Sequence, residues 1–352
     1  MASDPLREHG VPLASAPMVK QSDTPFRALV HAHGATLSYT QMLRPSLLLS
    51  DPDYIAFNRR ALALGRQTAG PVVVQLCGND AETLVRGART VVDLCDGVDL
   101  NLGCPQEVAR DEHFGAYLLG QKDWPLVQNL VSSLSHALPV PVSAKLRLCT
   151  PTVATVPLAQ SLAASGAAYV TLHARHASAR RRRHGAADLS VVKNLVQKLQ
   201  VPVVSNGNVR TWEDVKHNME ETCASGVMVG ETLLGNPHLF EAKLSDPVAM
   251  SLEYLEFCRA YPDTATLQTI QTHVRHIMSF QCQRQPWFRQ FDARLGQCAS
   301  VDEIEVLISD RVRRWRGGVA SIMSDEEEAE KTESWTDENF GLNDVFDVPR
   351  SP

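Results

Sequence analysis

The stretch PVVVQLCGNDAETLVRGARTVVDLCDGVDLNLGC, residues 71–104, contains the pattern on which the fold assignment depends. It begins with an apolar, β-branched run (71–78), continues with a segment of helical periodicity (81–95) and ends in a second apolar run (97–104). Short β-branched runs are typical of buried strands, and a strand, a helix and a strand in succession form a parallel βα unit. The stretch therefore predicts a parallel sheet covered by helices.

The same pattern repeats along the first two-thirds of the chain. Apolar runs occur at residues 11–18, 35–42, 71–78, 97–104, 141–148, 167–174, 201–208 and 226–233. Their starts lie 24 to 44 residues apart, the length of a βα unit, and eight such units close a (β/α)8 TIM barrel. A doubly wound open sheet would also alternate, but SAPMVKQSD (15–23) lacks the glycine-rich turn expected after its first strand. The sequence therefore favours a barrel.

The pattern changes after residue 240. Residues 249–316 have the periodicity of about four helices without a strand signal, which predicts a small C-terminal helical bundle. From residue 324 the chain is acidic and poor in branched apolar side chains, as disordered segments are. We expect an N-terminal extension (1–10), a barrel domain (11–245), a helical domain (246–320) and an acidic disordered tail (321–352).

The formal net charge of −6 is distributed unevenly. Residues 324–352 contain ten acidic and two basic side chains, a balance of −8, which leaves +2 for residues 1–323. The acidity belongs to the predicted tail, so the overall charge does not exclude a nucleic-acid partner for the body of the protein.

The composition is that of a globular chain, with 44% hydrophobic and 21% charged residues among 352. No stretch approaches the roughly 20 apolar residues of a membrane span, and MASDPLREHG (1–10) resembles neither a secretory signal nor a transit peptide. The eight cysteines form no CxxC pair and have no zinc-like spacing, which indicates reduced thiols. We expect a cytoplasmic or nuclear protein without a membrane segment or a metal.

Polar and small residues cluster at the ends of the predicted strands. The strands end in PM (17–18), QLCG (75–78), NLGC (101–104), KLR (145–147), LHAR (172–175), SNGN (205–208) and VGE (229–231). In a barrel the carboxyl ends of all strands lie on one face, which carries the active site. A single glycine or asparagine could be a turn residue, but seven polar strand ends predict a functional face.

These motifs resemble, in order, those of the tRNA-dihydrouridine synthases. The most specific is NLGCPQ (101–106), and the resemblance extends over roughly residues 11–320. It implies an FMN-dependent enzyme in which NADPH, or NADH, reduces the flavin. A hydride from flavin N5 then reaches C6 of a tRNA uridine, and a cysteine protonates C5. The barrel would bind FMN, and the helical domain (246–320) would bind tRNA.

The resemblance assigns the proton donor to Cys104. A thiol with a pKa near 8.5 is largely protonated at neutral pH, so it can act as a general acid without special tuning. The implied cofactor contacts are Pro17, Met18, Val19, Gln75, Lys145, His173, Asn206, Gly207, Asn208, Gly230 and Glu231. Lys145 would place positive charge at the N1/O2 side of the flavin, where it stabilises the anionic reduced form. Each of these residues could instead be an ordinary core or surface residue.

The last loops of the barrel depart from the usual family pattern. Barrels often bind phosphate with the loops after strands seven and eight, here NGN (206–208) and GET (230–232). Glu231 stands where many members have Arg, so only its backbone N–H can contact a phosphate. Ala174 and His176 stand where Gly and Thr are common. Glu231 also occurs in relatives that modify positions 16 and 17 of the D-loop, and it favours that subgroup.

The implied tRNA contacts are basic side chains and one amide beside the predicted mouth. They are Asn101, Arg175, Arg180, Arg181, Arg182, Arg183, Arg275 and Arg284. Basic side chains near aromatic ones suit phosphate contact and base stacking, and the uridine must leave its stack to reach a flavin. An arginine run is also a common solvated surface, so this remains an expectation.

Three alternatives stay open at the level of the sequence. The enzyme could act at positions 20a and 20b, it could be a flavin barrel that reduces a free pyrimidine or an enone, or it could bind RNA without catalysis. We expect tRNA as the partner and a monomer as the oligomeric state.

Overall fold

The computed structural model describes residues 12–66, 69–178 and 185–312. Its first part is a closed barrel of eight parallel strands in sequential order, closed by the pairing of β1 with β8. The strands are β1 (Leu13–Ser15), β2 (Leu37–Tyr39), β3 (Val72–Leu76), β4 (Gly97–Leu102), β5 (Val142–Leu148), β6 (Tyr169–His176), β7 (Val203–Asn206) and β8 (Gly226–Val229). Each coincides with one predicted run, so the barrel prediction is confirmed.

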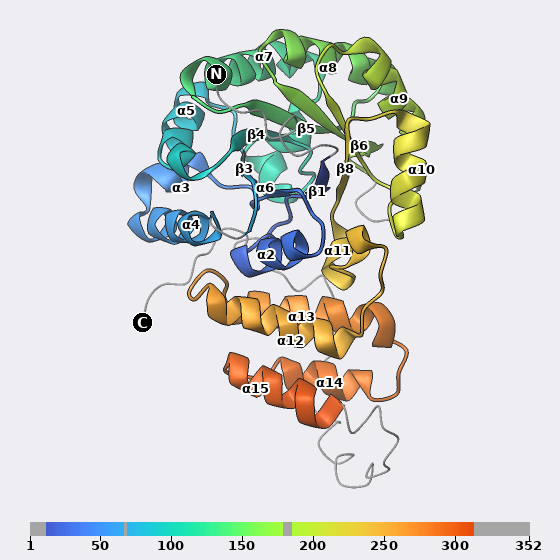
Figure 1. Ribbon diagram of the computed structural model, residues 1–352. Helices are drawn as coiled ribbons and strands as arrows, with labels where there is room; N and C mark the ends of the chain where they lie inside the picture. The colour runs from blue at the N-terminus through green and yellow to red at the C-terminus, as the bar shows by residue number, and fades with distance from the viewer. Residues whose placement is uncertain (1–11, 67–68, 179–184, 313–352) are drawn as a thin grey trace.

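Helices cover the outside of the barrel (Figure 1). They are α2 (Thr24–Ala32), α3 (Pro45–Ser50), α4 (Pro52–Gly65), α5 (Ala81–Arg89), α6 (Glu107–Asp111), α7 (Trp124–Ala137), α8 (Thr155–Ala164), α9 (Leu189–Lys198), α10 (Trp212–Thr222) and α11 (Glu231–Gly235). Short 3₁₀ turns are η1 (Val92–Leu94), η2 (Gly115–Leu118), η3 (Gln121–Asp123), η4 (Thr152–Ala154) and η6 (Leu239–Glu241). The outer sheet face and helices α3, α4, α5, α7, α8 and α9 bury one large apolar core. Burial of this core is the main stabilising contribution.

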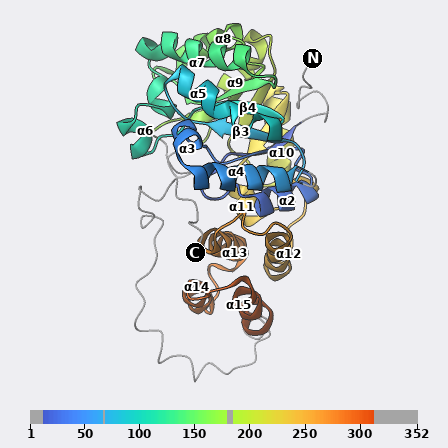
Figure 2. The same cartoon turned by 90° about the vertical axis from the view of Figure 1, so that its left-hand side faces the viewer.

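The second part consists of α12 (Pro247–Ala260), α13 (Leu267–Cys282), α14 (Phe288–Leu295) and α15 (Val301–Val306), which continues as the π-helix η7 (Leu307–Val312). These helices form a separate layer next to α2 and α11 (Figures 1 and 2). A continuous apolar core, which includes Phe26, Leu234 and Phe291, joins the two parts. The predicted helical region is therefore present and is packed against the barrel.

The inside of the barrel is less apolar than its outer core. Ala14, Leu37, Tyr39, Tyr169 and Met228 are among the side chains that fill it, and the two tyrosine hydroxyls are 2.8 Å apart. Toward the carboxyl ends the filling becomes polar, and buried Asp99 and Gln75 belong to this upper part. The polar layer predicts a site above it, at the mouth of the barrel.

In the described part of the chain, no helix has the length and apolar character that crossing a membrane requires.

Candidate active site

A cavity of about 860 Å³ opens at the carboxyl ends of the strands. We call it the first cavity. The predicted acid, all predicted cofactor contacts and two predicted RNA contacts line it: Pro17, Met18, Val19, Gln75, Asn101, Cys104, Lys145, His173, Arg175, Asn206, Gly207, Asn208, Gly230 and Glu231. Residues that are more than 200 positions apart in the chain therefore share one site. Its volume lies in the range of ligand pockets.

A chain of hydrogen bonds orients the amides on the floor of the first cavity. The carboxylate of Asp99 is fully buried and accepts from Gln75 Nε2 (2.8 Å) and from Ser143 Oγ (2.6 Å). Gln75 Oε1 then accepts from Asn101 Nδ2 at 2.8 Å. Because the carboxylate can only accept, it determines which way both amides face.

The same chain holds the backbone of the cysteine turn. Asn101 Oδ1 accepts from the backbone N–H of Gly103 (3.0 Å) and of Cys104 (2.9 Å). Gly115 packs against this turn with φ +64°, and a Cβ there would lie 2.8 Å from the carbonyl oxygen of Cys104. Asn101 therefore positions Cys104, a role more specific than the predicted RNA contact.

The thiol of Cys104 is buried but lines the first cavity, with 9% of the residue exposed. Burial raises its pKa, although a backbone contact at Gln106 and the charges of Arg147 and Lys145 oppose the rise. The sulfur lies 3.7 Å from Gln106 Oε1, to which it can donate. A thiol in this state is protonated at neutral pH, as a proton donor requires.

Four basic residues gather along the wall beside the cysteine turn, which β5 and β6 form. They are Lys145, Arg147, His173 and Arg175. Burial and the neighbouring Arg147 lower the pKa of Lys145 to about 8, whereas Asp99 and Cys104 oppose this shift. Burial and Arg175 lower the pKa of Arg147 to about 10. So many positive charges repel one another, and an anionic ligand would relieve the repulsion.

His173 is neutral in this setting. Burial, followed by the charges of Lys145, Arg147 and Arg175, lowers its pKa well below the usual value. Arg175 Nη1 lies 3.3 Å from His173 Nε2, and because arginine can only donate, Nε2 accepts. The ring proton therefore lies on Nδ1, which leaves His173 a donor at that atom.

The loops after β7 and β8 bring backbone to the first cavity. Gly207 has φ +132° and Asn208 has φ +58°, and a Cβ on Gly207 would lie 2.6 Å from Ala187 Cβ. The side chain of Asn208 exchanges hydrogen bonds with the backbone of Ala187 at 2.7 and 2.8 Å. Asn206 Nδ2 donates to the carbonyl of Met228 at 2.7 Å. These asparagines thus fix the loops, and the loop backbone and Gly230 form the surface available to a ligand.

A comparison with known proteins identifies this arrangement. Residues 14–307 match the family described as Dihydrouridine synthase (Dus). The chain belongs to this family. The tRNA-dihydrouridine(16/17) synthase-like protein of Mus musculus is 35% identical over 259 residues, 74% of this chain and 53% of that protein. The tRNA-dihydrouridine(16/17) synthase of Saccharomyces cerevisiae is 38% identical over 227 residues, 64% of this chain and 53% of that protein.

More distant relatives complete the comparison. The tRNA-dihydrouridine(20a/20b) synthase-like protein of Homo sapiens is 30% identical over 290 residues, 82% of this chain and 88% of that protein. The names of these relatives include NAD(P)(+). A solved structure of a 2-naphthoyl-CoA reductase has a TM-score of 0.52 at 9% identity, over 65% of this chain and 49% of that one, and shares the fold alone. The chain spans about half the length of the first two relatives.

The departures from the Dus family pattern lie in different surroundings. Ala174 is fully buried in the core between the sheet and the outer helices, and it faces away from the first cavity. His176 Nε2 lies 3.1 Å from Thr152 Oγ1. Only Glu231, the first residue of α11, lines the first cavity. Two of the three departures therefore lie outside the cavity lining.

Several residues that shape the site were not predicted. Arg147 donates from Nε to the carbonyl of Gly103 (2.9 Å) and from Nη1 to that of His176 (3.1 Å), so it ties the cysteine turn to β6. Asp99 supports Gln75 from below. Both carried a sequence signal, since Arg147 is the last residue of KLR and Asp99 is a charged residue within the apolar strand GVDLNL (97–102).

The predicted RNA contacts outside the first cavity are not brought together by the described residues. Arg275 pairs through Nε with Asp292 of α14 and is half-buried. Arg284 is exposed beyond the end of α13. Residues 180–183 lie outside the described part of the chain. Arg275 therefore has a structural partner, and the roles of the others stay predictions.

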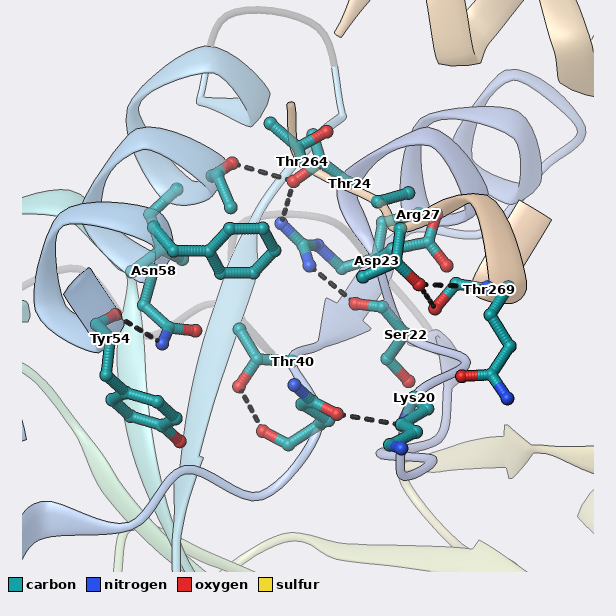
Figure 3. Close-up of a pocket in the computed structure, with 17 residues that line it drawn as sticks. Lys20, Ser22, Asp23, Thr24, Arg27, Thr40, Tyr54, Asn58, Thr264 and Thr269 are labelled. Atoms are coloured by element: carbon teal, nitrogen blue, oxygen red, sulfur yellow. Dashed lines mark hydrogen bonds between the residues drawn. The ribbon is translucent and has the colours of Figure 1, made fainter. Parts of the chain in front are cut away.

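A second cavity of about 370 Å³ lies between the mouth of the barrel and the helical part (Figure 3). It is lined by Lys20, Ser22, Asp23, Thr24, Arg27, Thr40, Gln41, Tyr54, Phe57, Asn58, Ala61, Leu62, Thr264, Ala265, Thr266, Gln268 and Thr269. Lys20 and Gln41 line the second cavity, whereas their chain neighbours Val19, Gln21 and Met42 line the first. The two cavities are thus separated by a single layer of chain.

One group of described side chains could approach a metal ion. His33, His238 and Glu241 each place a donor atom within 4.8 Å of the others. The two imidazole rings are tilted against each other, with centroids 3.5 Å apart and planes inclined by 33°. His33 Nε2 contacts Glu253 at 2.8 Å and His238 Nδ1 contacts Ser245 Oγ at 2.7 Å. We assign no metal site to this group, and the expected absence of a metal stays a prediction.

Proposed function

We propose that this Dus family member is an FMN- and NAD(P)H-dependent tRNA-dihydrouridine synthase that reduces uridine 16, uridine 17 or both in the D-loop. One observation carries the proposal: a cysteine whose pKa is raised by burial and a row of basic side chains line the same cavity of about 860 Å³. The relatives named for positions 16 and 17, at 35% and 38% identity, favour this specificity over positions 20a and 20b, for which the named relative is 30% identical.

The residues of the first cavity fit FMN. An isoalloxazine needs hydrogen-bonding groups along its polar edge and a positive charge near N1, and Gln75 and Lys145 offer these. A phosphate needs backbone N–H groups and cations, and the loops at Gly207 and Gly230 together with the cationic wall would supply them. When bound, reduced FMN would supply the hydride that reaches C6 of the uridine.

The protein's own contribution is to hold the uridine and deliver a proton. The thiol of Cys104 would transfer its proton from Sγ to C5, so that the C5=C6 double bond gains one hydrogen at each carbon. The thiolate that remains is stabilised by the nearby charges of Arg147 and Lys145 and regains a proton from solvent.

The test is enzymatic. Purified full-length protein is incubated with FMN, NADPH or NADH and an unmodified tRNA transcript, and dihydrouridine is mapped by position. Dihydrouridine at position 16 or 17 supports the proposal. Dihydrouridine at position 20a or 20b would instead show that the protein has the 20a/20b specificity. Reduction of free uracil with no reaction on tRNA would replace the proposal with a small-molecule reductase.

Two expectations from the sequence are also proposals. We propose that the protein acts as a monomer and that it is located in the cytoplasm, the nucleus or both, where tRNA is processed. Light scattering of the purified protein and microscopy of a tagged chain test them.

A further inference from the structure

The second cavity is distinguished by a buried cation with an unused donor. Arg27 is 3% exposed, and it donates from Nη1 to the carbonyl of Ser22 (2.7 Å) and from Nη2 to Thr24 Oγ1 (3.0 Å). Its Nε has no hydrogen-bond partner among the described residues. The Nε atom is itself enclosed, so what Arg27 offers a ligand in the cavity is its positive charge.

The remaining lining suits a flat, polar ring. Asn58 donates its amide to the carbonyl of Tyr54 (2.8 Å) and turns its amide oxygen toward the centre of the cavity (Figure 3). Hydroxyl groups of Thr40 and Thr269 and the ring of Phe57 also line it. Nucleobases are recognised in this way, through hydrogen bonds to their edges and contact of an aromatic or guanidinium plane with their face.

The position of the second cavity selects the source of such a ring. The backbone N–H of Lys20 donates to Gln41 Oε1 at 2.7 Å, and this contact forms part of the wall between the cavities. A nucleotide next to a base held in the first cavity would therefore lie close to the second. The helical part lines the second cavity with residues in the range 264–269, whereas the lining of the first cavity ends at Leu234.

We propose that the second cavity binds an unstacked nucleotide of the tRNA that neighbours the reduced uridine. This inference rests on the proposed function, because it takes the first cavity as the site of the uridine. It assigns to Arg27, Asn58 and Phe57 a role in substrate recognition outside the reaction itself.

A cycle of paired changes in protein and RNA tests the proposal. Ala265, on the loop before α13, lines the second cavity, and Ala265→Phe places a ring in the space assigned to the base. In the RNA, each of the two nucleotides on either side of the target uridine is replaced in turn by an abasic residue. We expect the protein change, and one of the abasic changes, each to raise the Kd for tRNA about tenfold.

The Kd of the variant protein for the abasic RNA decides whether the two changes remove the same contact. If the base lies in the second cavity, the double change raises Kd no further than either single change, because both remove the same contact. Effects that multiply to about a hundredfold would overturn the proposal, as would an Ala265→Phe variant that binds tRNA normally. Ala265→Ser leaves the cavity open and should bind tRNA as the wild type does.

A matched control separates a local effect from a general one. Ala164 is exposed at the end of α8, on the opposite end of the barrel from the strand carboxyl ends, and Ala164→Phe should leave Kd unchanged. If Ala265→Phe fails to fold, Gln268→Phe narrows the same cavity from an exposed position on α13. Wild-type protein that binds tRNA but forms no dihydrouridine would defeat the proposed function, while the binding cycle still judges the second cavity.

Discussion

A single thiol, that of Cys104, supplies the proton in the proposed reaction. Substitution of this residue is therefore the most direct test of the mechanism. Cys104→Ala should retain FMN and tRNA, because the backbone of the turn is held by Asn101, while dihydrouridine formation falls at least a hundredfold. Single-turnover assays with prereduced enzyme measure the loss. Cys77→Ala is the control. Cys77 belongs to the same small apolar cluster as Cys104 but does not line the first cavity. Equal activity of the two variants would remove Cys104 from the mechanism.

The buried carboxylate of Asp99 makes a pH dependence testable. Burial raises its pKa to about 6, although Ser143, Gln75 and Lys145 oppose the rise. Because this pKa exceeds the unfolded value of about 3.9, ionisation of Asp99 costs folding free energy, and the cost develops as the pH rises from about 4 to 6. Below pH 6 the protonated group no longer dictates the orientation of Gln75, so we expect FMN affinity to fall there.

Fluorescence titration of FMN between pH 5 and 8 measures this dependence. Asp99→Asn should bind FMN more weakly at pH 7 and lose the pH dependence between 5 and 7. Asp96→Asn is the control, since Asp96 accepts from the backbone of Val72 and does not line the first cavity. An unchanged profile in Asp99→Asn would assign the titration to another group.

The strand-end motifs identified part of the lining of the first cavity, including Cys104 and all the predicted cofactor contacts. The supporting contacts were not predicted, because they depend on which side chains meet across neighbouring strands. Gln75 and Asp99 are paired in register between β3 and β4, and Asn101 and Lys145 between β4 and β5. The sequence contains each of these residues, but only the register of the closed barrel shows which of them are neighbours.

At the scale of elements, a buried contact between a carboxylate and an imidazole joins the barrel to the helical part. Asp23 at the start of α2 accepts from His273 of α13 at 2.6 Å, and the imidazole stacks on Phe26 with centroids 4.6 Å apart. Burial alone would raise the pKa of Asp23, but the contact with His273, the backbone N–H of Phe26 and the charge of Arg27 together lower it. The stabilisation is therefore present above the unfolded value of about 3.9 and is lost as the pH falls through the lower folded value.

Asp23→Asn should lower the free energy of unfolding by about 3 kcal/mol at pH 7, because it removes one partner of a buried pair. Asparagine still caps α2, so the helix terminus is preserved. Urea unfolding measures the change. Asp80→Asn alters the cap of α5 in the same way at an exposed position and should change the stability little. Equal stabilities of the two variants would mean that the contact between Asp23 and His273 contributes nothing.

The elements themselves were largely predictable. Strands of the barrel are short apolar runs with regular spacing, and the helices of the second part have clear periodicity. The two-helix connection of α3 and α4 was not predicted, nor was the contact between Asp23 and His273, which are 250 residues apart. Such contacts depend on tertiary packing, which local pattern does not encode.

At the scale of the whole molecule, charge should govern RNA binding. Replacement of Arg180, Arg181, Arg182 and Arg183 by Ala removes four cations predicted to contact phosphates. The slope of log Kd against log salt should then decrease by about 3. Filter binding between 50 and 300 mM salt measures the slope. Lys193→Ala and Lys198→Ala in α9 remove charge from an outer helix and serve as controls. An unaltered slope would place residues 180–183 outside the RNA footprint.

The acidic terminus, in contrast, should weaken RNA binding. Residues 324–352 carry a balance of −8, and we expect their deletion to strengthen binding to unrelated RNA severalfold at low salt. Competition with a random RNA measures the change. If deletion leaves the affinity for unrelated RNA unchanged, the acidic terminus does not shield the rest of the protein from RNA.

The single layer of chain between the two cavities has a consequence for accuracy. Free energies of recognition at two subsites add, so the preferences of the subsites multiply, and two modest tenfold preferences select one nucleotide step a hundredfold over others. A D-loop that offers several uridines presents the same base each time but not the same neighbour. The enzyme would then choose among these uridines by recognising two adjacent nucleotides. The contact between Lys20 and Gln41 would set the distance between the two binding sites.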